Sequence, residues 1–163
     1  MPTRLLAPLA LVLCLGLFLS TGPGAARADT QLSGDGILRV KSAYGFDETV
    51  DRLKKDIAGK GIMFFMAVDQ AKLGSDAGIA LPASTLLVFG NPPLGIQFLT
   101  ANPNAGLDWP VRLLVSEDDK GQVWAVYTDF DWIKRRRGIT DRDAAFDTAA
   151  SVIASITSSV AAK

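Results

Sequence analysis

The stretch PVRLLVSEDDKGQVWAVYTD, residues 110–129, decides the fold because it holds two strand-like runs joined by a short polar turn. PVRLLVSE and QVWAVYTD are both rich in apolar, β-branched and aromatic residues, as is typical of β-strands. The DDKG segment between them is long enough only for a tight turn. Two strands joined in this way pair antiparallel, so the sequence predicts a β-hairpin.

Two helices are predicted downstream of this hairpin. FDWIKRRRG (130–138) suits a short helix, with Asp129 and Asp131 at its start, where carboxylates cap a helix and complement its dipole. A long helix is predicted over 141–162 because apolar residues recur along one side. Those residues are Phe146, Ala149, Ile153, Ile156 and Val160. The basic run KRRR (134–137) is interpreted as a solvated helix end, with a site for an anionic partner as the alternative.

Three strands and two helices are predicted upstream. ILRVKS (37–42) alternates and STLLVFG (84–90) is apolar, while the uninterrupted run IMFFMAVD (62–69) predicts a central strand buried on both faces. GFDETVDRLKKDIAGKG (45–61) predicts an amphipathic helix, and QAKLGSDAG (70–78) a short one. The apolar side of the first helix carries Phe46, Val50, Leu53 and Ile57. This order predicts an α+β fold: a two-layer sandwich whose mostly antiparallel sheet is covered by helices on one face.

The N-terminal residues 1–28 have the pattern of a cleaved signal peptide: one positive charge, a Leu-rich uncharged run, a Gly-Pro break and small residues before Asp29. The sequence therefore predicts an exported protein, periplasmic or secreted, with no stable membrane association after cleavage. Retention of the segment as an anchor is the alternative. Residues 29–36 are predicted to be a flexible lead-in, and residues 37–163 a single domain.

The composition excludes several classes of function. Loss of Arg4 and Arg27 with the leader leaves 15 basic residues against 17 acidic ones, which disfavours a nucleic-acid partner. The chain has no histidine, and its one cysteine, Cys14, lies in the predicted leader. Ser–His and Cys–His nucleophiles, thiolate chemistry and His- or Cys-ligated metal centres are thereby excluded. We expect no metal and no cofactor.

Three stretches of the chain resemble the domain of unknown function 302 (DUF302) family: VKSAYGFDETVDRLKKDIAGKG, LLVFGNP and WPVRLLVSEDDKGQVWAVYTD. The resemblance covers residues 37–139. It implies a small α+β fold with a twisted antiparallel sheet backed by helices, often found as a homodimer, and it implies no particular activity. Family members often place a histidine after the aspartate that ends the second strand. Here Gln70 follows Asp69, so the resemblance supplies no imidazole.

The segment LLVFGNPPLG (86–95) predicts a corner at which a strand turns into a helix. Gly90 allows a sharp turn, Asn91 can cap the helix, and Pro92 suits the first helical position. Free N–H groups at such a corner can hold an anion. The lysine and hydroxyl residue of a P-loop are missing, however, and prolines remove donors, so a structural corner is the preferred interpretation. We expect this corner to lie beside Asp69.

Two functional hypotheses follow. The first is a non-enzymatic module that binds a small apolar or amphipathic ligand, or a second copy of itself, through the sheet face and this corner. The alternative is a small hydrolase or isomerase that uses carboxylate and amide side chains there. The lack of histidine favours the first. The candidate ligand-binding residues are Asp69, Gln70, Phe89, Gly90, Asn91 and Trp109.

Overall fold

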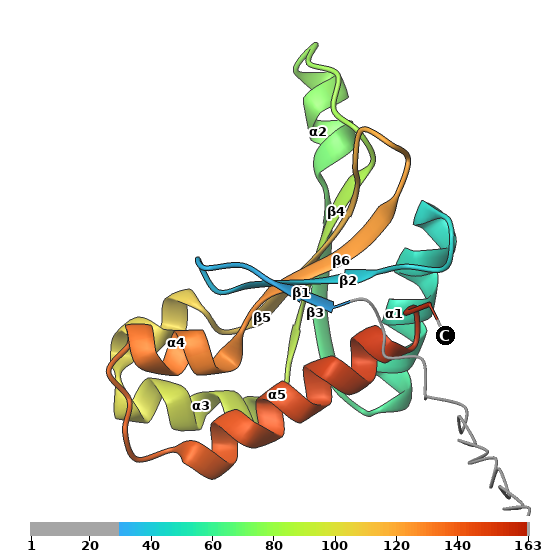
Figure 1. The fold of residues 1–163 in the computed structure, drawn as a ribbon. Helices are drawn as coiled ribbons and strands as arrows, with labels where there is room; N and C mark the ends of the chain where they lie inside the picture. Colours follow the sequence, from blue (N-terminus) through green and yellow to red (C-terminus); the bar gives the residue numbers. More distant parts are fainter. Residues whose placement is uncertain (1–29, 163) are drawn as a thin grey trace, which may run out of the picture.

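A six-stranded antiparallel sheet, with strand order β1-β2-β6-β5-β4-β3, organises the computed structural model of the chain, which describes residues 30–162 (Figure 1). Its strands are β1 (Thr30–Leu32), β2 (Ile37–Lys41), β3 (Met63–Asp69), β4 (Ser84–Gly90), β5 (Val111–Glu117) and β6 (Val123–Thr128). The helices are α1 (Phe46–Gly59), α2 (Gln70–Asp76), α3 (Pro92–Ala101), the 3-10 helix η1 (Pro103–Leu107), α4 (Phe130–Arg136) and α5 (Asp143–Ser158).

The β5–β6 hairpin lies within the sheet, as the sequence predicts. Leu114 is opposite Val126 in the register of the two strands. The turn between them is held by Asp118, whose carboxylate accepts hydrogen bonds from the backbone N–H of Gln122 at 2.9 Å and from the indole Nε1 of Trp124 at 2.8 Å. The hydrogen bond from Trp124, followed by that from Gln122, lowers the pKa of Asp118 below its ordinary value.

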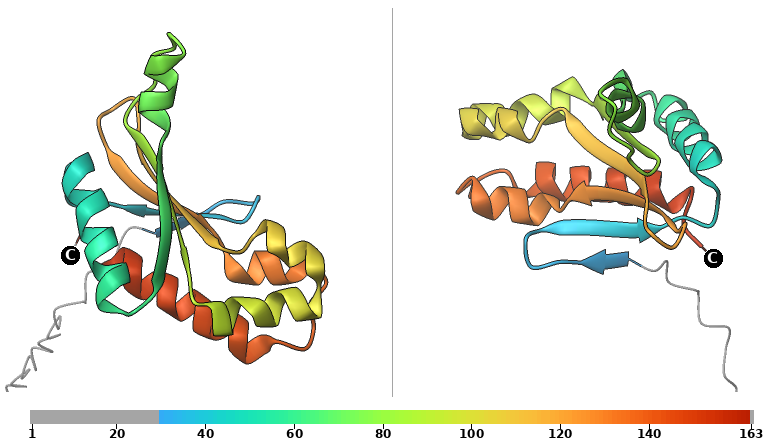
Figure 2. Two further views of the ribbon diagram at one scale, coloured as in Figure 1. Left: turned by 180° about the vertical axis from the view of Figure 1, so that it is seen from behind. Right: turned by 90° about the horizontal axis from the view of Figure 1, so that it is seen from above.

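The helices other than α2 cover one face of the sheet. Alternate side chains of the central strands are buried and their neighbours are only half-buried, which is the pattern of a sheet with one packed and one open face. Helices α1, α3 and α4 each contact α5 within the helical layer (Figure 2). The buried strand residues include Leu87, Phe89, Leu113, Val115, Val123, Ala125 and Tyr127. The α+β class and the two-layer arrangement are confirmed.

The amphipathic patterns correctly predict which side of each of the two longest helices faces the core. Leu53 and Ile57 of α1 have no exposed surface, and Phe46 and Val50 pack against the core from its edge. Helix α1 ends at Gly59, and Gly61 has a φ of 65°, which only glycine adopts without strain. All five residues of the apolar side predicted for the last helix are buried: four lie on α5, and Val160 lies two residues beyond its end. None of the helices within residues 30–162 is long and apolar enough to cross a membrane.

Strand β3 corrects one prediction. The apolar run at 62–69 is not a central strand buried on both faces: β3 is an edge strand, hydrogen-bonded to β4 on one side. Most of its side chains are exposed, including Met63, Phe64, Phe65 and Met66. An uninterrupted apolar run does indicate surface that is removed from water, but it does not say whether the chain itself or another molecule covers that surface.

The lead-in also differs from the expectation. Residues 30–32, predicted to be flexible, form strand β1, which pairs antiparallel with β2. The turn between the two strands is closed at Gly36, whose φ is 80° and whose α-carbon lies against the indole of Trp132. The predicted signal peptide, residues 1–28, lies outside the described residues.

Candidate functional site

The predicted corner is present at the end of β4. The strand ends at Gly90, Asn91 is the N-cap of α3, and Pro92 is the first residue of that helix. The Oδ1 atom of Asn91 accepts a hydrogen bond from the backbone N–H of Leu94 at 3.4 Å, which satisfies one of the free donors of the first helical turn. The corner therefore forms as the sequence indicates, and its cap is occupied by the chain itself.

The indole of Trp109 explains why glycine stands at the corner. A β-carbon at Gly90 would lie 2.9 Å from Nε1 of this indole, and one at Gly95 only 2.0 Å from it. Both distances are shorter than a van der Waals contact, so the ring can lie flat against the backbone only where no side chain intervenes. Phe65 of β3 stands edge-on to the same ring, with 6.3 Å between ring centroids. Trp109 is thereby held as a rigid wall.

Beneath this corner lies a small apolar cavity of about 30 Å³, the space of roughly one water molecule. Its walls come from both layers of the fold, because the sheet, α3 and α5 converge here. It is lined by Ile62, Phe89, Gly90, Asn91, Leu94, Gly95, Phe98, Trp109, Val111, Phe130, Ala149, Val152 and Ile153. Four of the six predicted ligand-binding residues, namely Phe89, Gly90, Asn91 and Trp109, are thus together in one cavity wall.

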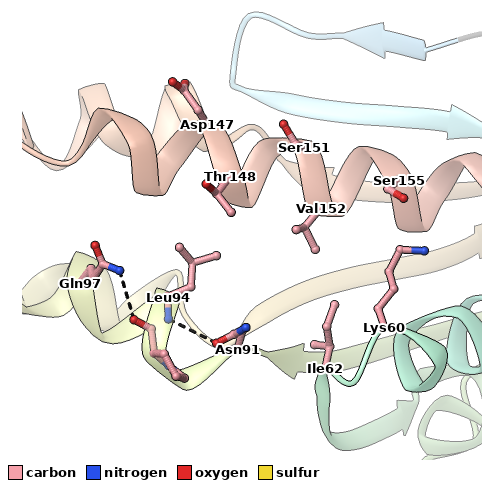
Figure 3. A pocket seen from close by; sticks show the side chains of 11 residues that line it. Lys60, Ile62, Asn91, Leu94, Gln97, Asp147, Thr148, Ser151, Val152 and Ser155 are labelled. Atoms are coloured by element: carbon pink, nitrogen blue, oxygen red, sulfur yellow. Dashed lines mark hydrogen bonds between the residues drawn. The ribbon is translucent and has the colours of Figure 1, made fainter.

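A larger open groove of about 790 Å³ adjoins this cavity, and Figure 3 shows the side chains that line the groove. The side chains of Ile62, Leu94 and Val152 face one another across it, and these three also line the cavity below. The groove therefore has an apolar floor, formed by α3, α5 and the residue that precedes β3. The complete lining is Lys60, Ile62, Asn91, Pro93, Leu94, Gln97, Asp147, Thr148, Ser151, Val152 and Ser155. We call this surface the α3–α5 groove.

The rim of the α3–α5 groove is polar. Lys60 lies at one end, where its Nζ atom is 2.5 Å from Oδ2 of Asp56, and Asp147 stands on the α5 side. The Thr148 hydroxyl donates a hydrogen bond to the Ala144 carbonyl at 2.7 Å. Charges of opposite sign thus border an apolar floor, an arrangement that suits a molecule with an apolar body and a polar end.

Asp69 and Gln70 lie elsewhere. Asp69 is opposite Thr85 in the β3–β4 pairing, whereas Gly90 is opposite Met63. Thr85 and Gly90 are five residue steps apart along β4, which corresponds to roughly 17 Å at the usual rise of a strand. The expectation that Asp69 lies beside the corner was wrong, because an antiparallel hairpin places the end of one strand beside the start of the next. Helices α2 and α3 mark opposite ends of the molecule (Figure 1).

Both residues have structural roles at the α2 end. The Asp69 carboxylate is the N-cap of α2 and accepts the backbone N–H of Lys72 at 2.8 Å. The Gln70 side-chain oxygen accepts the hydroxyl of Ser84 at 2.7 Å. A catalytic arrangement that joins Asp69, Gln70 and Asn91 on one substrate does not form, since Asn91 belongs to the other end of the hairpin.

The basic run 134–137 and the nearby carboxylates have structural roles around α4, as a helix cap and as ion-pair partners. Asp129 caps α4 through the backbone N–H of Trp132 at 3.1 Å, as predicted. Arg137 donates from Nε to Asp108 at 2.7 Å, and both side chains are nearly buried, at 12% and 9% exposure. Lys134 donates a hydrogen bond to the carboxylate of Asp143, and this bond raises the pKa of Lys134. The run is therefore only partly solvated, because Arg137 is an internal ion-pair partner.

Sequence reasoning missed the α5 and α1 sides of the groove. In the sequence, Ser151 and Ser155 are indistinguishable from the solvated residues of any amphipathic helix. Lys60 is likewise indistinguishable from a charged residue at the end of a helix. Only the packing of α3 against α5 shows that these residues border an apolar floor. A weak signal was present in Val152, an apolar residue beside the polar side of α5.

A family model described as "Domain of unknown function DUF302" matches residues 38–159. A crystal structure of the uncharacterized conserved protein DUF302 from Bacillus stearothermophilus has a TM-score of 0.69 to this chain, with 15% sequence identity, and covers 77% of this chain and 98% of that one. At that identity the likeness shows the fold alone.

Curated relatives include the fluoride-specific ion channel FluC 1 of Brucella suis, which is 33% identical over 104 residues. The match covers 64% of this chain and 41% of that protein. FluC 1 of Brucella abortus and FluC 2 of Brucella melitensis match equally well, over 38% of their length. The chain thus spans about two fifths of the length of these relatives.

Proposed function

Because the chain belongs to the DUF302 family, whose description carries no activity, we propose its function from the geometry of the site: non-catalytic binding of a small apolar or amphipathic ligand in the α3–α5 groove. The observation that carries the proposal is that this groove and the cavity beneath the corner adjoin, since the side chains of Ile62, Leu94 and Val152 line both.

The dimensions of the groove support a small ligand. Pockets that hold small molecules measure about 300–1,000 Å³ and are mostly apolar with a few polar groups at fixed places. The α3–α5 groove, at about 790 Å³, falls in this range. Its floor offers three aliphatic side chains, and its rim offers the hydroxyls of Ser151 and Ser155 together with the Lys60 ammonium. An apolar chain lying on the floor would leave its polar end at this rim.

The cavity below gives the ligand a way to gain affinity. At about 30 Å³ it is too small for more than the tip of a hydrocarbon chain, so a ligand must displace Leu94 or Val152 to enter it. The wall of the cavity formed by Trp109 is rigid, because the indole packs directly against Gly90 and Gly95. Each methylene buried there contributes about 0.8 kcal/mol, so the cavity favours a slender aliphatic end over a bulky ring.

A binding role is favoured over catalysis by the available side chains. The sequence has no histidine, and the ammonium of Lys60 at the groove is paired with Asp56 rather than placed against a nucleophile. The groove polar groups are therefore suited to hold a polar end and not to transfer protons to it. We include export from the cytoplasm in the proposal, on the strength of the sequence pattern at residues 1–28.

The name of the FluC relatives suggests fluoride as another ligand for this domain. We favour the apolar ligand, because a small, strongly hydrated anion gains nothing from a floor of Ile62, Leu94 and Val152 and loses its water there.

The proposal is tested by titrating the purified protein with decanoate, decanol and a nonionic alkyl detergent below its micelle concentration, using calorimetry and native mass spectrometry. We expect binding of at least one probe, and a loss of about tenfold or more in affinity on Ser151→Trp, because the indole fills the groove. Ala154→Trp is the matched control: it is an exposed position of α5 outside the groove lining and should bind as the wild type does. Equal loss in both variants, or no binding tighter than about 1 mM by any probe, contradicts the proposal.

A further inference from the structure

The open face of the sheet, opposite the helical layer, is apolar at its centre. Successive side chains of a strand point to opposite faces, so the neighbours of the buried strand residues lie on this face. The strand register places four aliphatic residues in one row across β6, β5, β4 and β3: Val126, Leu114, Leu86 and Val68. The rows on either side add Trp124 and Val88. We call this surface the open-face patch.

The composition of β4 indicates that the open-face patch is covered by another element. Leu87 and Phe89 point into the core, while Leu86 and Val88 point to the open face, so this strand is apolar on both sides. Strands with one side in water instead alternate apolar and polar residues. An apolar sheet face is stable when a second layer packs on it. Within residues 30–162 the helices other than α2 lie on the opposite face. The covering layer is therefore expected from another molecule.

The charges that border the open-face patch are positive. Arg39 and Lys41 of β2 lie along its β6 side, and Arg112 of β5 lies opposite Val88. The residues of β2, β4, β5 and β6 that point to this face include no carboxylate. Neither Arg39 nor Lys41 forms an ion pair within the described part of the chain, and Arg112 is 3.9 Å from Asp108. The patch thus offers cations whose partners the described chain does not supply.

Arg39 is held in place for such a partner. Its guanidinium carbon lies over the Trp124 ring, 4.8 Å from the centroid, and its Nε atom is buried with no hydrogen-bond partner. A buried donor that lacks an acceptor destabilises the structure, and an incoming carboxylate removes that penalty. The nearby carboxylate of Asp118 is engaged elsewhere, since it accepts the indole Nε1 of Trp124 at 2.8 Å.

We propose that the open-face patch binds an acidic amphipathic helix of another protein. Its apolar side covers the row of Val126, Leu114 and Leu86, and its carboxylates pair with Arg39 and Lys41. The row crosses four strands, about 14 Å at the usual strand spacing, which matches the roughly 16 Å length of an 11-residue helix. The inference is independent of the groove ligand, because the α3–α5 groove belongs to the helical layer on the other face.

The positive border disfavours the other occupants. A second copy of this chain would place the same cations against this face, and like charges in an interface oppose association. Residues 1–28 contain no acidic side chain, so that segment has no charge match either. A nucleic acid is disfavoured because acidic residues outnumber basic ones, 17 to 15, once Arg4 and Arg27 are set aside.

Two synthetic helical peptides of about 18 residues test the charge match. Both have leucine at positions i, i+3, i+4 and i+7; one has glutamate beside this apolar stripe and the other has glutamine. Fluorescence anisotropy of the labelled peptides measures binding to the purified protein. We expect the glutamate peptide to bind with a Kd of about 100 μM or tighter, and the glutamine peptide about tenfold more weakly. Raising the salt from about 50 mM to about 500 mM should weaken only the glutamate peptide.

Variants of the protein test the place of binding. Leu114→Glu puts a like charge in the centre of the row and should weaken the glutamate peptide about tenfold or more. Ile96→Glu is the matched control, because Ile96 is exposed on α3 and the charge change is the same. Arg39→Gln should weaken the glutamate peptide and leave the glutamine peptide unchanged. Thermal unfolding by circular dichroism shows whether each variant is folded.

Methyl NMR spectra should show shifts of Leu114 and Val126 on addition of the glutamate peptide, with Leu94 and Val152 of the groove unmoved. The proposal is overturned if neither peptide binds more tightly than about 1 mM, if both bind equally, or if Ile96→Glu loses as much affinity as Leu114→Glu. Two outcomes would assign the face to another occupant and also overturn it. One is tighter binding of a single-stranded oligonucleotide at the same methyl groups, and the other is a wild-type dimer that Leu114→Glu converts to single chains.

Discussion

Substitution of Gly95 by alanine tests the packing of the corner most directly. The new β-carbon would lie 2.0 Å from Nε1 and Cε2 of Trp109, and the ring of Phe65 also packs against this indole, nearly perpendicular to it. Overpacking of a well-packed core costs typically about 1–3 kcal/mol, and a contact this short with a rigid ring belongs at the upper end. This cost is partly offset, because alanine is more favourable than glycine in a helix by about 1 kcal/mol. We therefore expect a net loss of about 2 kcal/mol.

For a domain of this size, a loss of 2 kcal/mol corresponds to a fall of about 7 °C in Tm. The measurement is urea and thermal unfolding followed by circular dichroism. Gly59→Ala is the control. Gly59 is also a helical residue, the last of α1, but its β-carbon would meet open space. This substitution should be neutral or stabilise the fold by up to about 1 kcal/mol.

A double-mutant cycle separates the clash from other effects. In a Trp109→Leu background the indole is gone, so Gly95→Ala should lose its penalty and show only the gain in helix propensity. The coupling energy between the two positions should then be about 2–3 kcal/mol. Equal destabilisation by Gly95→Ala with and without the indole would refute the reasoning, as would a Gly95→Ala variant that is as stable as the wild type.

Three further results are expected. Asp108→Ala should reduce the free energy of unfolding by about 3 kcal/mol, measured in urea, because it leaves the nearly buried guanidinium of Arg137 unpaired; a loss below about 1 kcal/mol speaks against a structural ion pair. Asp129→Ala should cost about 1 kcal/mol through loss of the α4 cap, and Asp129→Asn, which can still accept the N–H, should recover most of it. Because the folded-state pKa of Asp118 is lowered from 3.8, its stabilising effect is present above that value and is lost as the pH falls through the lowered pKa. Asp118→Asn should therefore flatten the acid limb of the stability profile, and an unchanged limb would contradict this.

Local features of the fold are readable from the sequence because they depend on neighbours in the chain. The spacing of Leu53 and Ile57 determines which side of α1 faces the core, and Asn91 followed by Pro92 determines where α3 begins. The corner residues also share one cavity wall, since they follow one another along the chain or pack directly on it. The fold class follows from the order of these elements.

Long-range features are not readable in the same way. The apolar run of β3 indicates burial, but its place at the edge of the sheet depends on which strands pair, and that is decided far along the chain. The position of each at the end of a strand predicts that Asp69 lies beside Gly90, but the antiparallel register of β3 and β4 sets these two ends far apart. The α5 side of the groove becomes a site only through packing of Val152 opposite Leu94.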